Sequence, residues 1–103
     1  MEEVVLITVP SEEVARTIAK ALVEERLAAC VNIVPGLTSI YRWQGEVVED
    51  KELLLLVKTT THAFPKLNER VKALLPYTVP EIVALLIAVG NREYLDWLRE
   101  NTG

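Results

Sequence analysis

The stretch Leu53-Leu54-Leu55-Leu56-Val57-Lys58-Thr59-Thr60 decides the fold of this chain. It opens with five aliphatic residues and carries a single charge, on Lys58, close to its end. Short apolar runs with polar ends are typical of a strand that is buried on both faces of a sheet. We therefore predict a strand over residues 53–60 and place the other elements around it.

The segment before this strand predicts two further strands and a helix. Residues 4–9 are mostly β-branched or aliphatic and read as the first strand. Ser11 suits the N-cap of a helix that runs to about Leu27, because its hydroxyl accepts a backbone N–H bond. Residues 28–34 predict the second strand, and Pro35-Gly36 is the turn signal that ends it.

An irregular segment joins these elements to residues 53–60. Residues 37–44 predict an extended segment, Gly45 a turn, and the acidic residues 46–52 an exposed hairpin arm. Side chains two positions apart on an extended chain share a face. This alternation places Ser39, Tyr41 and Trp43 on one face of the arm.

The C-terminal half predicts a helix, a stiff connector, a fourth strand and a last short helix. Thr61 is the predicted cap of the first of these helices. Its apolar stripe follows the helical period and consists of Phe64, Leu67, Val71, Leu74 and Leu75. Prolines 76 and 80 stiffen the connector over residues 75–81. Residues 82–89 predict the fourth strand, and Gly90-Asn91 opens the short helix.

The order strand, helix, strand, strand, helix, strand predicts an α+β domain over residues 1–103, with a ferredoxin-like βαββαβ antiparallel sheet, a hairpin arm and a C-terminal helix. Both main helices of such a fold cover one face of the sheet, so the other face should alternate toward polar residues. In residues 53–57 and 82–87, however, both the odd-numbered and the even-numbered positions are apolar, so both faces of these strands are apolar. We expect a homo-oligomer whose sheets face inward.

Composition limits which binding partners and which cellular compartment we expect for this protein. The formal net charge is −4, with 15 acidic and 11 basic residues and no long basic run, which argues against nucleic acid. No apolar stretch approaches the roughly 18 residues that a membrane span needs. The single cysteine, Cys30, cannot form an intrachain disulfide, and residues 1–4 lack the features of a secretory signal. We expect a cytoplasmic protein with no nucleic-acid or membrane partner.

Five short motifs follow one another along the chain: Leu27-Ala28-Ala29-Cys30-Val31-Asn32, Ser39-Ile40-Tyr41-Arg42-Trp43-Gln44-Gly45, Lys58-Thr59-Thr60, Pro76-Tyr77-Thr78-Val79-Pro80-Glu81 and Tyr94-Leu95-Asp96-Trp97-Leu98. With these motifs in this order, the chain resembles the CutA divalent-cation tolerance family over nearly its whole length. The resemblance implies a ferredoxin-like subunit, a tight homotrimer similar to the trimeric PII signalling proteins, a cytoplasmic location, and a link to copper and heavy-metal tolerance.

The metal ligands that some members of this family carry have no counterpart here. The matching positions hold Ile7, Leu74 and Leu75, and aliphatic side chains do not ligate copper. Cys30 is a weak metal candidate: it is either a small buried hydrophobe or a soft ligand for Cu(I) that three chains would supply together. His62, the only histidine, reads as a surface residue. No cofactor is required, and copper or another divalent cation is the candidate ion.

Three aromatic residues outside the regular elements, Tyr41, Trp43 and Tyr77, have two interpretations. Their rings pack across the trimer interface, or they line a ligand-binding cleft between subunits. The polar partners in such a cleft would be Ser39, Lys58, Thr59 and Glu81. Because the third and fourth strands of this fold run parallel, Lys58 and Glu81 lie at opposite ends of one sheet. A site that uses both must therefore be assembled between chains.

No set of residues in the sequence predicts an enzyme. A Ser-His-Asp or Cys-His arrangement has only His62 to draw on, and the turn at Pro10 has no glycine for a phosphate-binding loop. We predict a trimeric, cytoplasmic divalent-cation (copper) tolerance protein with a metal-binding or regulatory role. The alternatives are a PII-like sensor of an anionic metabolite, with Lys58 or Arg42 as the charge partner, and a trimeric scaffold or adaptor without a metal site.

Overall fold

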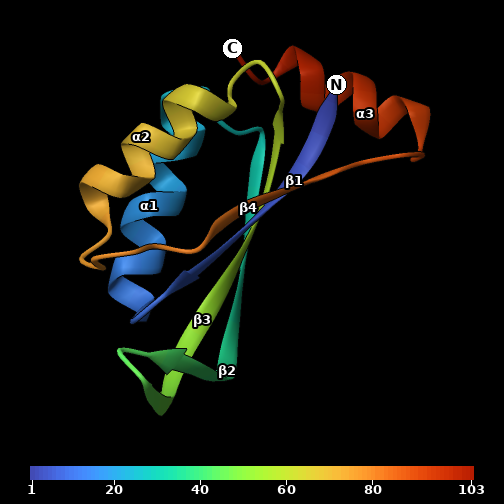
Figure 1. The fold of residues 1–103 in the computed structure, drawn as a ribbon. Coiled ribbons are helices and arrows are strands. Elements are labelled where there is room, and N and C mark those ends of the chain that lie inside the picture. Colours follow the sequence, from blue (N-terminus) through green and yellow to red (C-terminus); the bar gives the residue numbers. More distant parts are fainter.

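The computed structural model describes residues 1–103 and contains one four-stranded sheet and three helices. In chain order the elements are β1 (Glu2–Val9), α1 (Glu12–Glu24), β2 (Cys30–Trp43), β3 (Glu46–Thr60), α2 (Phe64–Leu74), β4 (Ile82–Leu86) and α3 (Arg92–Glu100). The sheet order is β2-β3-β1-β4, and every neighbouring pair is antiparallel (Figure 1). The predicted ferredoxin-like α+β fold is confirmed.

Helices α1 and α2 cover one face of the sheet (Figure 1). Helix α1 begins where predicted, because the Ser11 side chain accepts the Val14 N–H at 3.2 Å. The stripe that α1 buries packs in one cluster with the stripe of α2 and with alternate residues of the two central strands. The fully buried members of this core include Ile18, Leu22, Leu67, Val71, Val5, Ile7, Leu55 and Val57.

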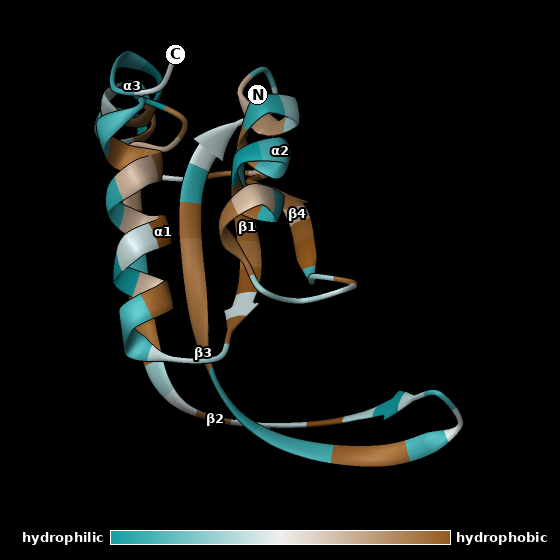
Figure 2. Cartoon of the chain, turned by 90° about the vertical axis from the view of Figure 1, so that its left-hand side faces the viewer, coloured by the Kyte–Doolittle hydropathy of each residue, from teal (hydrophilic) through white to brown (hydrophobic).

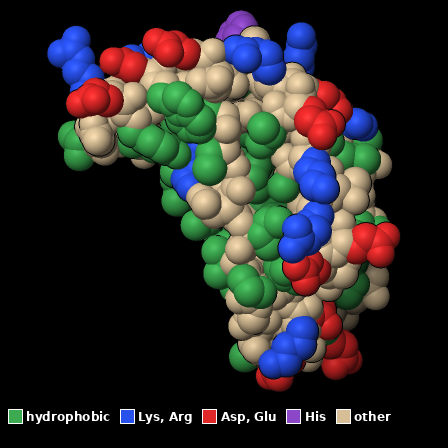
Figure 3. All heavy atoms as spheres, turned by 180° about the vertical axis from the view of Figure 1, so that it is seen from behind, with side chains coloured by type: hydrophobic (Ala, Val, Ile, Leu, Met, Phe, Trp, Pro, Cys, Tyr) green, Lys and Arg blue, Asp and Glu red, His purple; other side chains and the backbone are tan.

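The other face, which we call the outer face, is apolar and largely uncovered. The strand register places the alternate residues of the central strands there, including Leu6 opposite Leu56 and Val83, and Val4 opposite Leu85. Hydrophobic side chains gather over this face in Figure 3. Helix α3 covers only one end of it, where Leu98 is buried and Arg99 forms a 3.0 Å ion pair with Glu2.

The paired strands β2 and β3 continue past the helices as a hairpin arm, residues 37–52 (Figures 1 and 2). A two-residue turn joins them, with φ of 49° at Gln44 and 82° at Gly45. Left-handed conformations at both positions match the right-handed twist of a hairpin. Along β3 the hydropathy changes from apolar to polar where the strand leaves the sheet (Figure 2). The exposed hairpin arm over residues 46–52 is thus present.

Two predicted boundaries in this region are wrong. Pro35-Gly36 does not end a strand: β2 runs on through a bulge between Val34 and Leu37, with Gly36 at φ of 82°. Likewise β3 begins at Glu46 and not at Leu53. The pairing between β2 and β3 satisfies backbone groups along the whole arm, so these strands need no continuous apolar run.

Three element ends also differ from the predictions. Helix α1 stops at Glu24, short of Leu27, and Arg26 then adopts a left-handed φ of 60°. Strand β4 ends at Leu86 instead of residue 89. Thr61 does not cap α2, whose N-cap is Ala63; the Thr61 hydroxyl instead accepts a hydrogen bond from the N-terminal ammonium at 3.1 Å.

The predicted short C-terminal helix is present as α3, and the Asn91 side chain caps it by accepting the Glu93 N–H at 3.0 Å. None of the three helices has the length and apolar character needed to cross a membrane.

Candidate functional site

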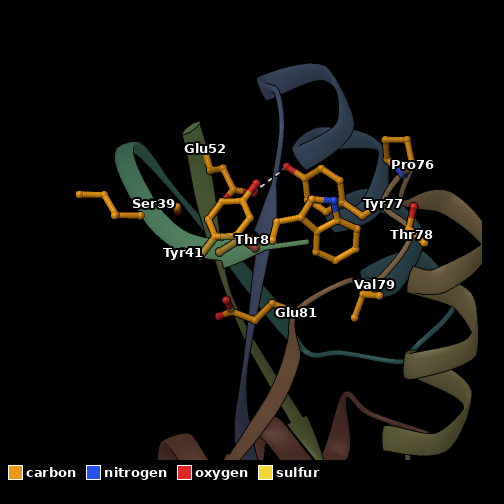
Figure 4. A pocket seen from close by; sticks show the side chains of 11 residues that line it. Thr8, Ser39, Tyr41, Glu52, Pro76, Tyr77, Thr78, Val79 and Glu81 are labelled. Atoms are coloured by element: carbon orange, nitrogen blue, oxygen red, sulfur yellow. Dashed lines mark hydrogen bonds between the residues drawn. The ribbon is translucent and has the colours of Figure 1, made fainter. Parts of the chain in front are cut away.

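A cleft of about 600 Å³ opens where the arm leaves the sheet. Figure 4 shows side chains from β1, from the arm and from the α2–β4 connector around it. The cleft is on the side of the outer face, because Thr8 shares the parity of Leu6 and lies opposite Leu54. Its lining consists of Thr8, Ser39, Ile40, Tyr41, Trp43, Glu52, Pro76, Tyr77, Thr78, Val79 and Glu81.

Strand alternation and a proline-stiffened connector position the aromatic side chains. Ser39, Tyr41 and Trp43 lie on one face of β2 because they are two residues apart. Tyr77 comes from the connector between α2 and β4 and packs against the core from there. These rings and the carboxylate of Glu81 therefore reach the cleft from different parts of the chain (Figure 4).

Two carboxylates of β3 hold the tyrosine hydroxyls. Tyr77 donates a 2.6 Å hydrogen bond to Oε2 of Glu52, and Tyr41 donates a short hydrogen bond to Asp50. Burial and the bond to Glu52 raise the pKa of Tyr77, while the bond to Asp50 is the main cause that raises the pKa of Tyr41. Both tyrosines therefore stay neutral and direct their protons at carboxylates.

Five of the seven residues predicted for a ligand cleft meet here: Ser39, Tyr41, Trp43, Tyr77 and Glu81. Lys58 and Thr59 do not. Lys58 lies opposite Val4, toward the other end of the sheet, and donates to the side-chain oxygen of Asn32. Thr59 is fully buried, and its hydroxyl donates a 2.6 Å bond to the carbonyl of Leu27.

The predicted cleft did not include the polar lining residues Thr8, Glu52 and Thr78, or Asp50, which accepts the Tyr41 hydroxyl. A signal exists for the two carboxylates. If Gln44-Gly45 is taken as a two-residue turn, counting back pairs Trp43 with Glu46, Ser39 with Asp50 and Leu37 with Glu52, as the structure does. The sequence predictions treated these acidic residues as an exposed arm or a weak cation site, and neither interpretation uses this register.

No part of the chain fits a copper site. No group of three or more His, Cys, Asp or Glu side chains lies in an arrangement that could hold a metal ion. The Cys30 thiol lies 3.9 Å from the side-chain oxygen of Asn32, and it is also near the hydroxyl of Tyr94, whose pKa is raised mainly by burial and then by the thiol. Ile7 and Leu75 are buried aliphatic side chains.

No serine or cysteine is hydrogen-bonded to a histidine in the structure. His62 is exposed at the turn before α2 and takes part in none of the side-chain hydrogen bonds. The Ser11 hydroxyl accepts a backbone N–H as a helix cap, and the Cys30 thiol faces Asn32. The cleft itself offers hydroxyls, carboxylates and aromatic rings, which bind ligands without forming covalent bonds.

Comparison with known proteins gives consistent results. Residues 3–101 match the family model described as CutA1 divalent ion tolerance protein. A divalent-cation tolerance protein CutA from Thermus thermophilus is 95% identical over 103 residues, and the match covers 100% of both chains. A solved structure of a divalent cation tolerance protein from Thermus thermophilus superposes with a TM-score of 0.99 at 95% identity, covering 100% of each chain. Human protein CutA is 48% identical over 96 residues, which are 93% of this chain and 54% of that protein. The chain thus spans about half the length of the human relative.

Proposed function

Since the chain belongs to the CutA1 divalent ion tolerance protein family, we propose that it acts in the cytoplasm as a homotrimeric divalent-cation tolerance protein. Its role in this proposal is binding or regulation and not catalysis. The family is a tolerance family by its description, and no Ser-His or Cys-His pair supports an enzymatic reaction.

The uncovered outer face is the observation that supports the proposed trimer. Val83 and Leu85 of β4 are 47% and 53% exposed, and they continue the apolar surface of Leu6 and Leu56. Contiguous apolar patches of this kind mark interaction surfaces in soluble proteins. The hairpin arm projects beside this face and offers a second surface to a neighbouring subunit (Figures 1 and 3).

Light scattering coupled to gel filtration tests the assembly. At micromolar concentration we expect a mass of three times the 11.6 kDa subunit. A mass of one subunit, unchanged on concentration, contradicts the proposal. The cytoplasmic location is supported by the lone free cysteine, because disulfides are rare in reducing compartments.

We further propose that cation tolerance involves the assembled oligomer and no copper site within one subunit. Cys30 is the only thiol, and Ile7, Leu74 and Leu75 supply no ligand. Calorimetric titration of the reduced, metal-free protein with Cu(I) and Cu(II) should give no saturable binding of one ion per subunit. Saturable binding with that stoichiometry, lost in Cys30→Ser, contradicts this part of the proposal.

A second candidate function is the sensing of a small molecule, and the cleft favours it. Its volume of about 600 Å³ falls within the usual range of small-molecule sites, roughly 300 to 1,000 Å³. Dialysis of the protein against small molecules of either charge tests this function, and retention of none of them argues against it. That result would favour the scaffold or adaptor function over small-molecule sensing.

A further inference from the structure

Arg26 adopts a backbone conformation that glycine usually supplies. It follows the C-terminal end of α1 with a φ of 60°. Its N–H donates to the Val23 carbonyl at 3.1 Å, and the Leu27 N–H donates to the Leu22 carbonyl at 2.8 Å, which is the hydrogen-bond pattern of a Schellman motif. A side chain strains this left-handed position, so helices commonly have glycine there. Contacts of the arginine side chain must offset this strain.

The Arg26 side chain binds the C-terminal end of α3, which lies beside the end of α1 (Figure 2). Its Nη2 donates to the Glu100 carbonyl at 2.7 Å, and its Nε donates to the Gly103 carbonyl at 2.8 Å. The Gly103 N–H donates back to the Arg26 carbonyl at 2.7 Å. These three bonds connect the ends of two helices that are far apart in the sequence.

Arg26 also satisfies a backbone group that α3 leaves without a partner. The last four carbonyls of an α-helix accept no hydrogen bond from within the helix. Asn101 and Thr102, which follow α3, donate to three of these four carbonyls. The remaining one, the Glu100 carbonyl, accepts from the Arg26 guanidinium. A positive group there also suits the negative end of the helix dipole.

Helix α3 depends on such attachments, because it has only nine residues. Isolated helices shorter than about 12 residues are marginal in water. Within its own subunit α3 buries one side chain, that of Leu98, and Arg99 adds the ion pair to Glu2. The connector that leads into α3, residues 88–91, lies outside the strands and helices. Arg26 is therefore the attachment at the C-terminal end of this helix.

We propose that Arg26 is a latch, which holds α3 against the end of the sheet, and that α3 opens as one unit about residues 88–91 when the latch is released. An opened α3 takes Leu98 away from the end of the outer face and the Tyr94 hydroxyl away from the Cys30 thiol. Arg26 itself belongs to the loop after α1 and lies neither on the outer face nor on the arm. The latch thus controls access to one end of the outer face from outside the proposed subunit interface.

Residue-resolved hydrogen exchange on the assembled protein tests the latch. Arg26→Met removes the guanidinium and keeps an unbranched side chain of similar reach. An undocked α3 does not keep its helix, so opening as one unit should speed the exchange of all its protected amides by the same factor, about tenfold. The amides of α1 and β1 should keep their rates within about twofold. Light scattering of the same samples checks that the variant has the mass of the unmodified protein.

Three further variants separate the latch from backbone strain and from general charge. Arg26→Gly removes the guanidinium and relaxes the left-handed position, so it should speed exchange in α3 while slowing it in the last turn of α1. Arg26→Lys keeps the charge without the planar fork and should give an intermediate acceleration. Arg16→Met is the matched control, because Arg16 is an exposed arginine that pairs only with Glu12 inside α1. It should leave the exchange of α3 unchanged.

Four results overturn the proposal. An unchanged exchange of α3 in Arg26→Met shows that the guanidinium does not hold this helix. Acceleration confined to residues 98–102 shows fraying of the last turn and no opening as one unit. Equal acceleration in α1, β1 and α3 shows a loss of global stability. An equal effect of Arg16→Met and Arg26→Met on α3 shows a general effect of charge.

Discussion

Glu3 is the one charged side chain that the molecule buries. It is 3% exposed, it lies opposite Thr59 on the helix-covered face, and its Oε1 has no hydrogen-bond partner. Burial raises the pKa of this carboxyl, and the nearby N-terminal ammonium offsets part of the effect. The charged form is therefore the less favourable one in the folded protein.

The sign of the resulting pH dependence follows from that shift. A carboxyl with a raised pKa stabilises the fold only below its ordinary pKa, and this contribution is lost as the pH rises through the folded pKa. Glu3→Gln should raise the free energy of unfolding at neutral pH by about 1 kcal/mol and change it little near pH 3.5. Urea denaturation at both pH values and one protein concentration checks this. An increment of equal size at both pH values, or one shared by the exposed control Glu49→Gln, argues against it.

Thr59 has a structural role, although its motif suggested a ligand contact. Its buried hydroxyl donates to the Leu27 carbonyl and fixes the loop after α1 to β3. Thr59→Val keeps the shape but removes the donor, so it should lower the free energy of unfolding by about 1 to 2 kcal/mol. Thr59→Ser retains the hydroxyl and serves as the control in the same denaturation series. If Thr59→Val lowers the free energy of unfolding no more than Thr59→Ser does, the hydrogen bond is not what stabilises this position.

At the scale of elements, the turn of the hairpin arm is a position where conformation alone sets stability. A Cβ at Gly45 would meet no atom within 4 Å, but the residue has a φ of 82°. Gly45→Ala should therefore cost about 1 kcal/mol through backbone strain. Gln44→Asn should stabilise by a few tenths of a kcal/mol, because asparagine tolerates the left-handed region better. Thermal denaturation of both variants checks the opposite signs, and two shifts of the same sign contradict them.

The periodic parts of the chain were predictable from the sequence, and the arm was not fully so. Apolar runs and helical stripes predict all four strands and three helices, because the residues on a buried face recur with the period of the strand or helix. The bulge at Pro35-Gly36 carries the residues of a turn, so a local reading ends the strand there. Residues 87–89 show the reverse problem, because they are apolar yet lie beyond the last residue of β4.

The candidate site divides in the same way. Ser39, Tyr41 and Trp43 share a face by simple alternation, and the parallel course of β3 and β4 correctly separates Lys58 from Glu81. Glu52 depends on the turn at Gln44-Gly45, from which the pairing must be counted across two strands. Tyr77 donates its hydroxyl proton to Glu52 from a distant part of the chain, and no local sequence pattern predicts this tertiary contact.

At the scale of the whole molecule, the outer face predicts which surface change separates the proposed subunits. Leu85 is 53% exposed on the edge strand β4 of this face, and a charge there would be buried in the proposed assembly without a partner. Leu85→Glu should reduce the mass measured by light scattering toward that of one subunit. Val23→Glu is the matched control, because Val23 is 42% exposed but belongs to α1 on the helical side. A trimer mass in Leu85→Glu, or dissociation by Val23→Glu as well, contradicts this assignment of the interface.

The central position of β1 has a consequence for the order in which the chain folds. Its two neighbours, β3 and β4, follow it at increasing distance along the chain, whereas β2 and β3 are joined by a two-residue turn. Contacts between sequence-distant segments carry the larger loop-closure entropy and form late. The hairpin can therefore nucleate early. One edge of β1 stays unpaired until β4 is available, which is after almost the entire chain has left the ribosome. Pulse-labelled hydrogen exchange should detect protected hairpin amides before those shared by β1 and β4.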